Sequence, residues 1–110
     1  MVERRDTQRI QISCPIVYWV PNSNNEIEAQ GTGLALDISI DGMMFESNEQ
    51  IKATKLFIRT SSNNGGAIKV EGYIVYSIPY FNGKYRSGFR FMEPHKQVST
   101  FVDELKRTPS

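Results

Sequence analysis

Apolar and polar residues alternate along most of this chain, in short runs that are separated by clusters of turn-forming residues. A period of two residues is the period of a β-strand with one buried face, so this pattern predicts strands. The expected strands cover residues 10–20, 28–40, 43–47, 55–60, 67–78 and 85–92. Six short strands joined by turns favour a small antiparallel barrel that is closed or nearly closed.

The period changes after Pro94, where apolar residues recur at the spacing of an amphipathic helix: Val98, Phe101, Val102 and Leu105. Proline suits the first turn of a helix, so we expect a short helix over residues 95–107. Its apolar face would plug an open side of the barrel. The predicted fold is therefore mostly β, a six-stranded antiparallel barrel with a short C-terminal α-helix.

The first two expected strands carry several informative positions. Cys14 lies on the apolar face of the first strand and is predicted to be a core residue. Pro15 cannot donate to a strand ladder, so the strand should be an edge or bulged there. Trp19, on the opposite face, either packs a satellite cluster or forms a surface contact. In the second strand, Gly31 and Gly33 predict a bulge or sharp curvature.

Composition limits the kinds of partner. The chain has 110 residues, enough for one domain with a modest core, and 39% of them are hydrophobic. Its 13 basic and 12 acidic residues leave a net charge of +1, which argues against a nucleic-acid partner. No apolar run reaches the length of a membrane span, and no secretory leader is visible, so we expect a cytoplasmic protein with no membrane insertion.

Motifs for catalysis and metal binding are missing from the sequence. It contains no Gly-x-Ser-x-Gly, no phosphate-cradling Gly-x-x-x-x-Gly-Lys loop and a single histidine. Its single cysteine excludes a disulfide within the chain and a multi-cysteine zinc site. We therefore predict no enzymatic activity, no catalytic residue, no metal and no cofactor.

Arginines gather at the N-terminus, where Arg4, Arg5 and Arg9 fall within six positions. Residues 1–9 have no apolar period and are expected to form a flexible, exposed arm. A solvated, charged terminus would have the same composition. Alternatively, these arginines bind an anion, because a guanidinium offers two parallel donors to a phosphate or to the O6 and N7 edge of guanine.

A second polar group ends the strand over 28–40, in the stretch Asp37-Ile38-Ser39-Ile40-Asp41-Gly42. The predicted buried face of this strand holds Leu34, Leu36, Ile38 and Ile40, so Asp37 and Ser39 would leave the opposite face. Gly42 is expected to allow a left-handed bend and close approach of a ligand to the backbone. A carboxylate accepts from the N1–H and amine of guanine, and a hydroxyl can donate to phosphate. Together with the arginines, these residues favour a ligand that combines guanine with phosphate.

The sequence resembles a known family at these two motifs. Residues 5–9 have the form Arg-x-x-x-Arg, and residues 37–42 have the form Asp-x-Ser-x-x-Gly. This pair, at this spacing, is similar to the signature of PilZ domains, bacterial second-messenger receptors for cyclic di-GMP. Residues 72–76 and 85–91 resemble the late strands of that family. The resemblance implies a PilZ-type β-barrel over residues 10–107, with a ligand-binding arm at 1–9.

The resemblance also implies roles for individual residues. Arg5 and Arg9 would bind the phosphates and guanines of cyclic di-GMP, while Asp37, Ser39 and Gly42 would form the opposing wall. Arg4, directly before the first motif arginine, implies binding of two intercalated ligand molecules. Many relatives have Gly-Gly where this chain has Asp41-Gly42, and the added carboxylate is expected to weaken affinity. Tyr76 suits the same pocket and the core equally well.

The function that follows is a cyclic di-GMP-binding effector. Ligand binding would order the arm 1–9, and the signal would pass to an unidentified partner protein. The alternative is a PilZ-like protein-interaction module that binds no nucleotide.

Overall fold

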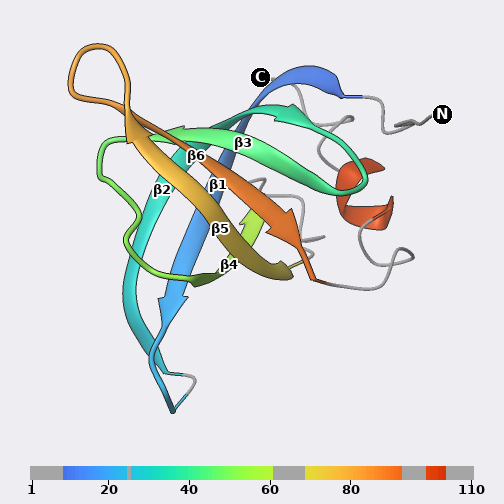
Figure 1. Ribbon diagram of the computed structural model, residues 1–110. Helices are drawn as coiled ribbons and strands as arrows, with labels where there is room; N and C mark the ends of the chain where they lie inside the picture. Colours follow the sequence, from blue (N-terminus) through green and yellow to red (C-terminus); the bar gives the residue numbers. More distant parts are fainter. Residues whose placement is uncertain (1–8, 25, 61–68, 93–98, 104–110) are drawn as a thin grey trace, which may run out of the picture.

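Six antiparallel strands close into a barrel in the computed structural model, which describes residues 9–24, 26–60, 69–92 and 99–103 (Figure 1). The strands are β1 (Ile10–Pro21), β2 (Ile27–Ile38), β3 (Gly42–Ser47), β4 (Lys55–Thr60), β5 (Lys69–Pro79) and β6 (Tyr85–Phe91). Their order around the barrel is β1-β2-β3-β6-β5-β4, and pairing of β1 with β4 completes the circle. This architecture confirms the predicted six-stranded barrel.

The inner faces of the strands form one apolar core. Its most deeply buried side chains are Phe45, Phe101, Ile16, Ile38, Met43, Leu56, Ile58, Val70 and Cys14. Burial of Cys14 confirms its prediction as a core residue. Alternation correctly indicates the inward faces of β1, β4 and β6. The inward side chains of these strands are buried in the middle of each strand, and those near the ends of β1 and β6, such as Ile10 and Phe91, are partly buried against the core.

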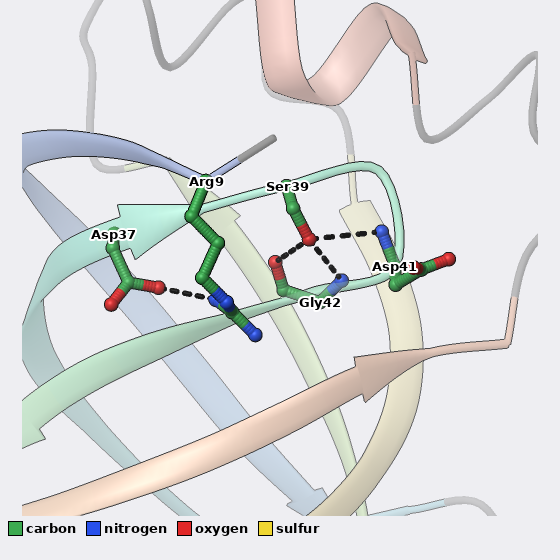
Figure 2. Close-up of polar contacts among 5 residues, drawn as sticks. All are labelled: Arg9, Asp37, Ser39, Asp41 and Gly42. Atoms are coloured by element: carbon green, nitrogen blue, oxygen red, sulfur yellow. Dashed lines mark hydrogen bonds and ion pairs between the residues drawn. The ribbon is translucent and has the colours of Figure 1, made fainter. Parts of the chain in front are cut away.

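A helical turn at residues 99–103 covers one end of the barrel, on the same side as the turn between β2 and β3 (Figures 1 and 2). Phe101 is fully buried there, and its ring meets the ring of Phe91 edge-on at 5.9 Å between centroids. The rest of the predicted helix, 95–98 and 104–107, lies outside the described residues. In the part of the chain that the structure describes, no helix has the length and apolar character to cross a bilayer.

One extra residue in each of two strands reverses the inside–outside alternation. The register between β2 and β3 shifts between Ala35 and Asp37, so Leu36 is a bulge residue. The prediction of a buried face with Leu34, Leu36, Ile38 and Ile40 is therefore wrong. Of these four only Ile38 is buried, and Ala35 takes the inward position before the bulge.

The second bulge falls at Val75 of β5, where the register with β6 shifts between Ile74 and Tyr76. Val70 points inward before the bulge, and Ser77 does so after it, where its hydroxyl lies 2.8 Å from that of Ser87. Tyr76 consequently points outward and is not a core residue, which decides between the two positions open to it in the sequence.

The glycines of β2 make room for neighbours and cause no bulge. The β1–β2 register runs without a shift through Gly31 and Gly33, so the bulge predicted there is wrong. A Cβ atom at Gly31 would lie 2.5 Å from the hydroxyl oxygen of Tyr18. Burial of that ring, with the nearby charge of Glu49, raises the pKa of the Tyr18 phenol above its ordinary value.

The ladder between β1 and β2 is irregular shortly before Pro15. Its register shifts between Gln11 and Cys14, whereas Pro15 itself is paired with Leu34. The predicted bulge therefore lies before the proline and not at it, and β1, which pairs with both β2 and β4, is not an edge strand. Further along β1, Trp19 faces Phe57 of β4, and the guanidinium of Arg59 lies 5.3 Å from its ring centroid. Trp19 thus belongs to a satellite cluster on the outer face of the barrel.

Removal of the Phe101 ring should destabilise the barrel strongly. We expect Phe101→Ala to lower the free energy of unfolding by about 3–5 kcal/mol, because it leaves a cavity in a closed core. Asp103→Ala, on the exposed side of the same helical turn, should change it by less than about 0.5 kcal/mol. Urea unfolding of both variants measures the difference, and equal effects would mean that the helix does not close the core.

Candidate functional site

A cavity of about 550 Å³ opens at the end of the barrel that carries the β2–β3 turn. Its walls come from the residue before β1, the end of β2, the β2–β3 turn, the bulge of β5 and the middle of β6. Its lining includes Arg9, Asp37, Ser39, Gly42, Tyr76 and Arg90. This volume lies within the range typical of small-molecule sites, about 300–1,000 Å³.

The two bulges place polar and aromatic side chains on one outward row across four strands. Asp37 of β2 is opposite Met44 of β3, which is opposite Gly88 of β6, which in turn is opposite Tyr76 of β5. Without the extra residues at 36 and 75, Asp37 and Tyr76 would have the opposite orientation. The row forms the floor of the cavity.

Arg9 lies at one end of this row, beside Asp37. It directly precedes β1, and the pairing of Gln11 with Asp37 brings it to the end of β2. Its Nη1 donates to Oδ1 of Asp37 in a close ion pair (Figure 2). The Arg9 side chain is 55% exposed and that of Asp37 is 21% exposed. The site therefore contains a cation and an anion that are both accessible to a ligand.

Ser39 closes the turn between β2 and β3. Its Oγ accepts from the backbone amides of Asp41 at 3.2 Å and Gly42 at 3.3 Å, and it donates to the carbonyl of Gly42 at 3.4 Å (Figure 2). The residue is buried. A buried amide without a partner is costly, so this hydroxyl stabilises the turn. Ser39 lines the cavity, but it does not leave the exposed face beside Asp37 as predicted, because it is buried and most of its hydrogen-bonding capacity is used within the turn.

Gly42 is needed for close packing of two strands. The prediction of a left-handed bend at this residue is wrong, because the described residues with positive φ are Asn82 and Gly83. A Cβ atom at Gly42 would lie 2.2 Å from the carbonyl oxygen of Phe89 on β6. The missing side chain thus allows β3 and β6 to approach, and it keeps the cavity wall at backbone level.

The structure brings together four of the six predicted site residues: Arg9, Asp37, Ser39 and Gly42. Arg4 and Arg5 lie outside the described residues. Sequence reasoning missed Arg90, which is exposed on β6 opposite Gly42. Its signal was its place in the alternation of β6, where Ser87 and Phe89 point inward and Arg90 must point outward. Within the described ranges, no three acidic, histidine or cysteine side chains gather as metal ligands.

Comparison with known proteins identifies the class. The family model of the PilZ domain matches residues 3–106, nearly the whole chain, and the protein belongs to this family. The resemblance of the two motifs to the PilZ signature is therefore confirmed. Among curated protein sequences, none matches this chain.

Solved structures share the fold at low identity. The PilZ domain of Escherichia coli YcgR, solved with c-di-GMP, has a TM-score of 0.63 and 18% identity, covering 96% of this chain and 93% of that one. The PilZ domain of CeSA from a cellulose-synthesising bacterium has a TM-score of 0.59 and 21% identity, covering 90% of this chain and 95% of that one. The Bacillus subtilis inhibitor of motility MotI/DgrA has a TM-score of 0.65 and 12% identity, covering 96% of this chain but 51% of that protein.

The β2–β3 turn should depend on the Ser39 hydroxyl. Ser39→Ala leaves two turn amides without their acceptor, so we expect the free energy of unfolding to fall by about 1–3 kcal/mol. Ser13→Ala, at an exposed position of β1, removes the same hydroxyl outside the turn and should have little effect. Chemical denaturation measures both, and an unchanged Ser39→Ala variant would show that the turn does not need this group.

Proposed function

We propose that this PilZ domain is a receptor for cyclic di-GMP. The observation that carries the proposal is the placement of Arg9 and Asp37 side by side on the wall of one cavity, next to the turn that holds Ser39 and Gly42. Family membership supports it, and so do the structural neighbours whose names include c-di-GMP, among them the PlzA protein of Borreliella burgdorferi.

The ion pair suggests how the ligand would enter. In the described structure Arg9 and Asp37 satisfy each other. A phosphate or the O6 and N7 edge of guanine fits the guanidinium with two parallel hydrogen bonds, while the N1–H and amine of guanine fit the carboxylate. Cyclic di-GMP supplies both kinds of group. In our proposal, cyclic di-GMP breaks the ion pair between Arg9 and Asp37 and makes its own hydrogen bonds to both side chains.

The remaining motif arginines complete the proposed clamp. Arg5 precedes Arg9 by four residues, and four residues of fully extended chain reach at most about 14 Å. Since Arg9 is fixed at the cavity wall, Arg5 is within reach of the same ligand. We propose that binding orders the arm 1–9 over the cavity, and that Arg4 stacks on a guanine of a second, intercalated molecule.

Tyr76 and Arg90 extend the proposed site on the opposite wall. The Tyr76 ring packs on Gly88, where a Cβ atom would lie 2.3 Å from the ring, and its outer face is exposed. An exposed aromatic face is a stacking surface for a guanine base. Arg90 adds a second cation to the cavity. Its charge would offset the carboxylate of Asp41 in the attraction of a dianionic ligand.

The alternative function is a protein-interaction module that binds no nucleotide. Such a module would keep the Arg9–Asp37 ion pair intact, because this contact satisfies both charged groups without a ligand. Calorimetric titration with cyclic di-GMP separates the two functions. Heat of binding at micromolar protein supports the receptor, and its absence supports the interaction module.

Loss of the Arg9 guanidinium, with its two parallel donors, should weaken cyclic di-GMP binding. We expect Arg9→Ala to cost about 1–3 kcal/mol of binding free energy, a loss of roughly 5-fold to 150-fold in affinity, by analogy with other bidentate guanine contacts. Arg9→Lys keeps the positive charge but removes the two parallel donors of the guanidinium, so it should lose less affinity than Arg9→Ala but still bind more weakly than the unaltered protein. Lys52→Ala removes an exposed charge outside the cavity and is the control. Loss at Lys52 equal to that at Arg9 would contradict a specific contact.

Salt should weaken binding, because attraction between the arginines and the phosphates is screened. We expect affinity to fall steadily as ionic strength rises, and the dependence to be shallower in Arg9→Ala, which has one cation fewer at the ligand. Titrations at several salt concentrations measure both slopes. A salt-independent affinity would argue against phosphate recognition by the arginines.

A further inference from the structure

The outer face of β5 exposes a run of large apolar side chains. Tyr73 is 43% exposed, Val75 65%, Tyr76 42% and Ile78 51%. They occupy the successive outward positions of the strand around its bulge, and we call them the β5 patch. Isolated exposed apolar residues are ordinary, but a contiguous set on one strand indicates an interaction surface.

Basic side chains border this patch on both sides. Lys55 of β4 and Arg90 of β6 are both opposite Tyr73, and Arg86 of β6 is opposite Ile78. Lys55 pairs with Glu71 at 3.0 Å, and Arg86 pairs with Glu46 at 3.4 Å. No carboxylate of the described residues pairs with Arg90. Arg90 therefore leaves this border one positive charge in excess, which Asp41 on the adjoining cavity wall partly offsets.

We propose that the β5 patch docks a partner protein that presents apolar side chains bordered by carboxylates. Tyrosine, arginine and aliphatic groups in a central position are the composition of a protein interface. The most exposed members, Val75 and Ile78, are aliphatic and cannot stack on bases, so the patch suits a protein better than a nucleic acid.

Two other modes of docking fit less well. A symmetric dimer through this patch would bring the basic border of one copy against that of the other. Strand addition needs a free sheet edge. β5 pairs with β6 through Pro79 but with β4 only as far as Tyr73, and beyond that point Gln50 of the loop before β4 donates to the carbonyl of Ser77 at 2.9 Å. With that edge partly covered by the loop, the exposed side chains are the main docking surface, and acidic groups on the partner would complement Arg90, whose neighbours Lys55 and Arg86 already pair with Glu71 and Glu46.

The β5 patch is continuous with the ligand cavity. Val75 and Tyr76 belong to both surfaces. A nucleotide on Tyr76 would contact the edge of the docking surface and change its affinity for the partner. This coupling rests on the proposed function, whereas the docking surface itself does not.

The experiment selects peptides against the whole protein, with and without saturating cyclic di-GMP. A phage library of randomised short peptides is the probe, and enriched sequences are synthesised and measured by fluorescence anisotropy. We expect them to combine apolar residues with Asp or Glu. Ile78→Ser should lower their affinity roughly tenfold or more, and Arg90→Glu should lower it as well. Ile27→Ser, which removes a 60% exposed isoleucine from β2, is the matched control and should have no effect.

Several outcomes would overturn the proposal. They are an absence of enriched peptides, enriched peptides without acidic residues, and unchanged binding to Ile78→Ser. Binding of a labelled oligothymidylate that is lost in Ile78→Ser would assign the patch to nucleic acid, and a dimer that dissociates in this variant would assign it to a second copy.

Calorimetry separates this proposal from the nucleotide function. Ile78 does not line the cavity, so Ile78→Ser should still bind cyclic di-GMP as the unaltered protein does. Acidic peptides that bind at Ile78 in a protein without nucleotide binding would keep the docking surface and reject the receptor. Nucleotide binding with no peptide binding at the patch would keep the receptor and reject the docking surface.

Discussion

The single-residue bulges at Leu36 and Val75 determine which side chains line the cavity of this barrel. Each reverses the alternation of its strand, and they lie on opposite sides of the β3–β6 pair. Asp37 and Tyr76 therefore point outward on the same row. With a regular alternation, the carboxylate of Asp37 would point into an apolar core, where a charge without a partner is very costly. The bulges thus make a polar cavity compatible with a well-packed interior.

The same bulges explain which parts of the structure could be predicted from the sequence. The strands, the barrel and the helical turn follow from periodicity, because every inward residue of β1, β4 and β6 obeys it. A bulge cannot be recognised in this way. Leu36 is as apolar as a core residue, so the sequence continues to alternate regularly at the position where the strand has an extra residue. The two motifs predicted that Arg9, Asp37, Ser39 and Gly42 belong together, and these residues do meet. Arg90 lies in neither motif, and only its outward position on β6 reveals it.

The motif residues divide into two groups by their structural duty. Ser39 holds two amides of the turn, and Gly42 lets β3 approach the carbonyl of Phe89. Substitution of either alters the cavity through the backbone, so lost binding in such a variant does not establish a ligand contact. Arg9 and Asp37 are different, because their interaction lies at the surface and the barrel does not depend on it for closure. Binding measurements on variants of these two residues are therefore the most direct test of the proposed ligand contacts.

If both proposals hold, the residues shared by the cavity and the β5 patch would make their two occupants thermodynamically linked. If nucleotide on Tyr76 strengthens partner binding by some factor, the partner must strengthen nucleotide binding by the same factor. A small barrel has few ways to transmit a signal by rearranging its core, because closed strand pairing and dense packing resist continuous deformation. Direct contact across Val75 and Tyr76 requires no such rearrangement. Since both proposed sites lie on one face of one bulged strand, a single domain of this size would be able to connect a ligand with a protein partner.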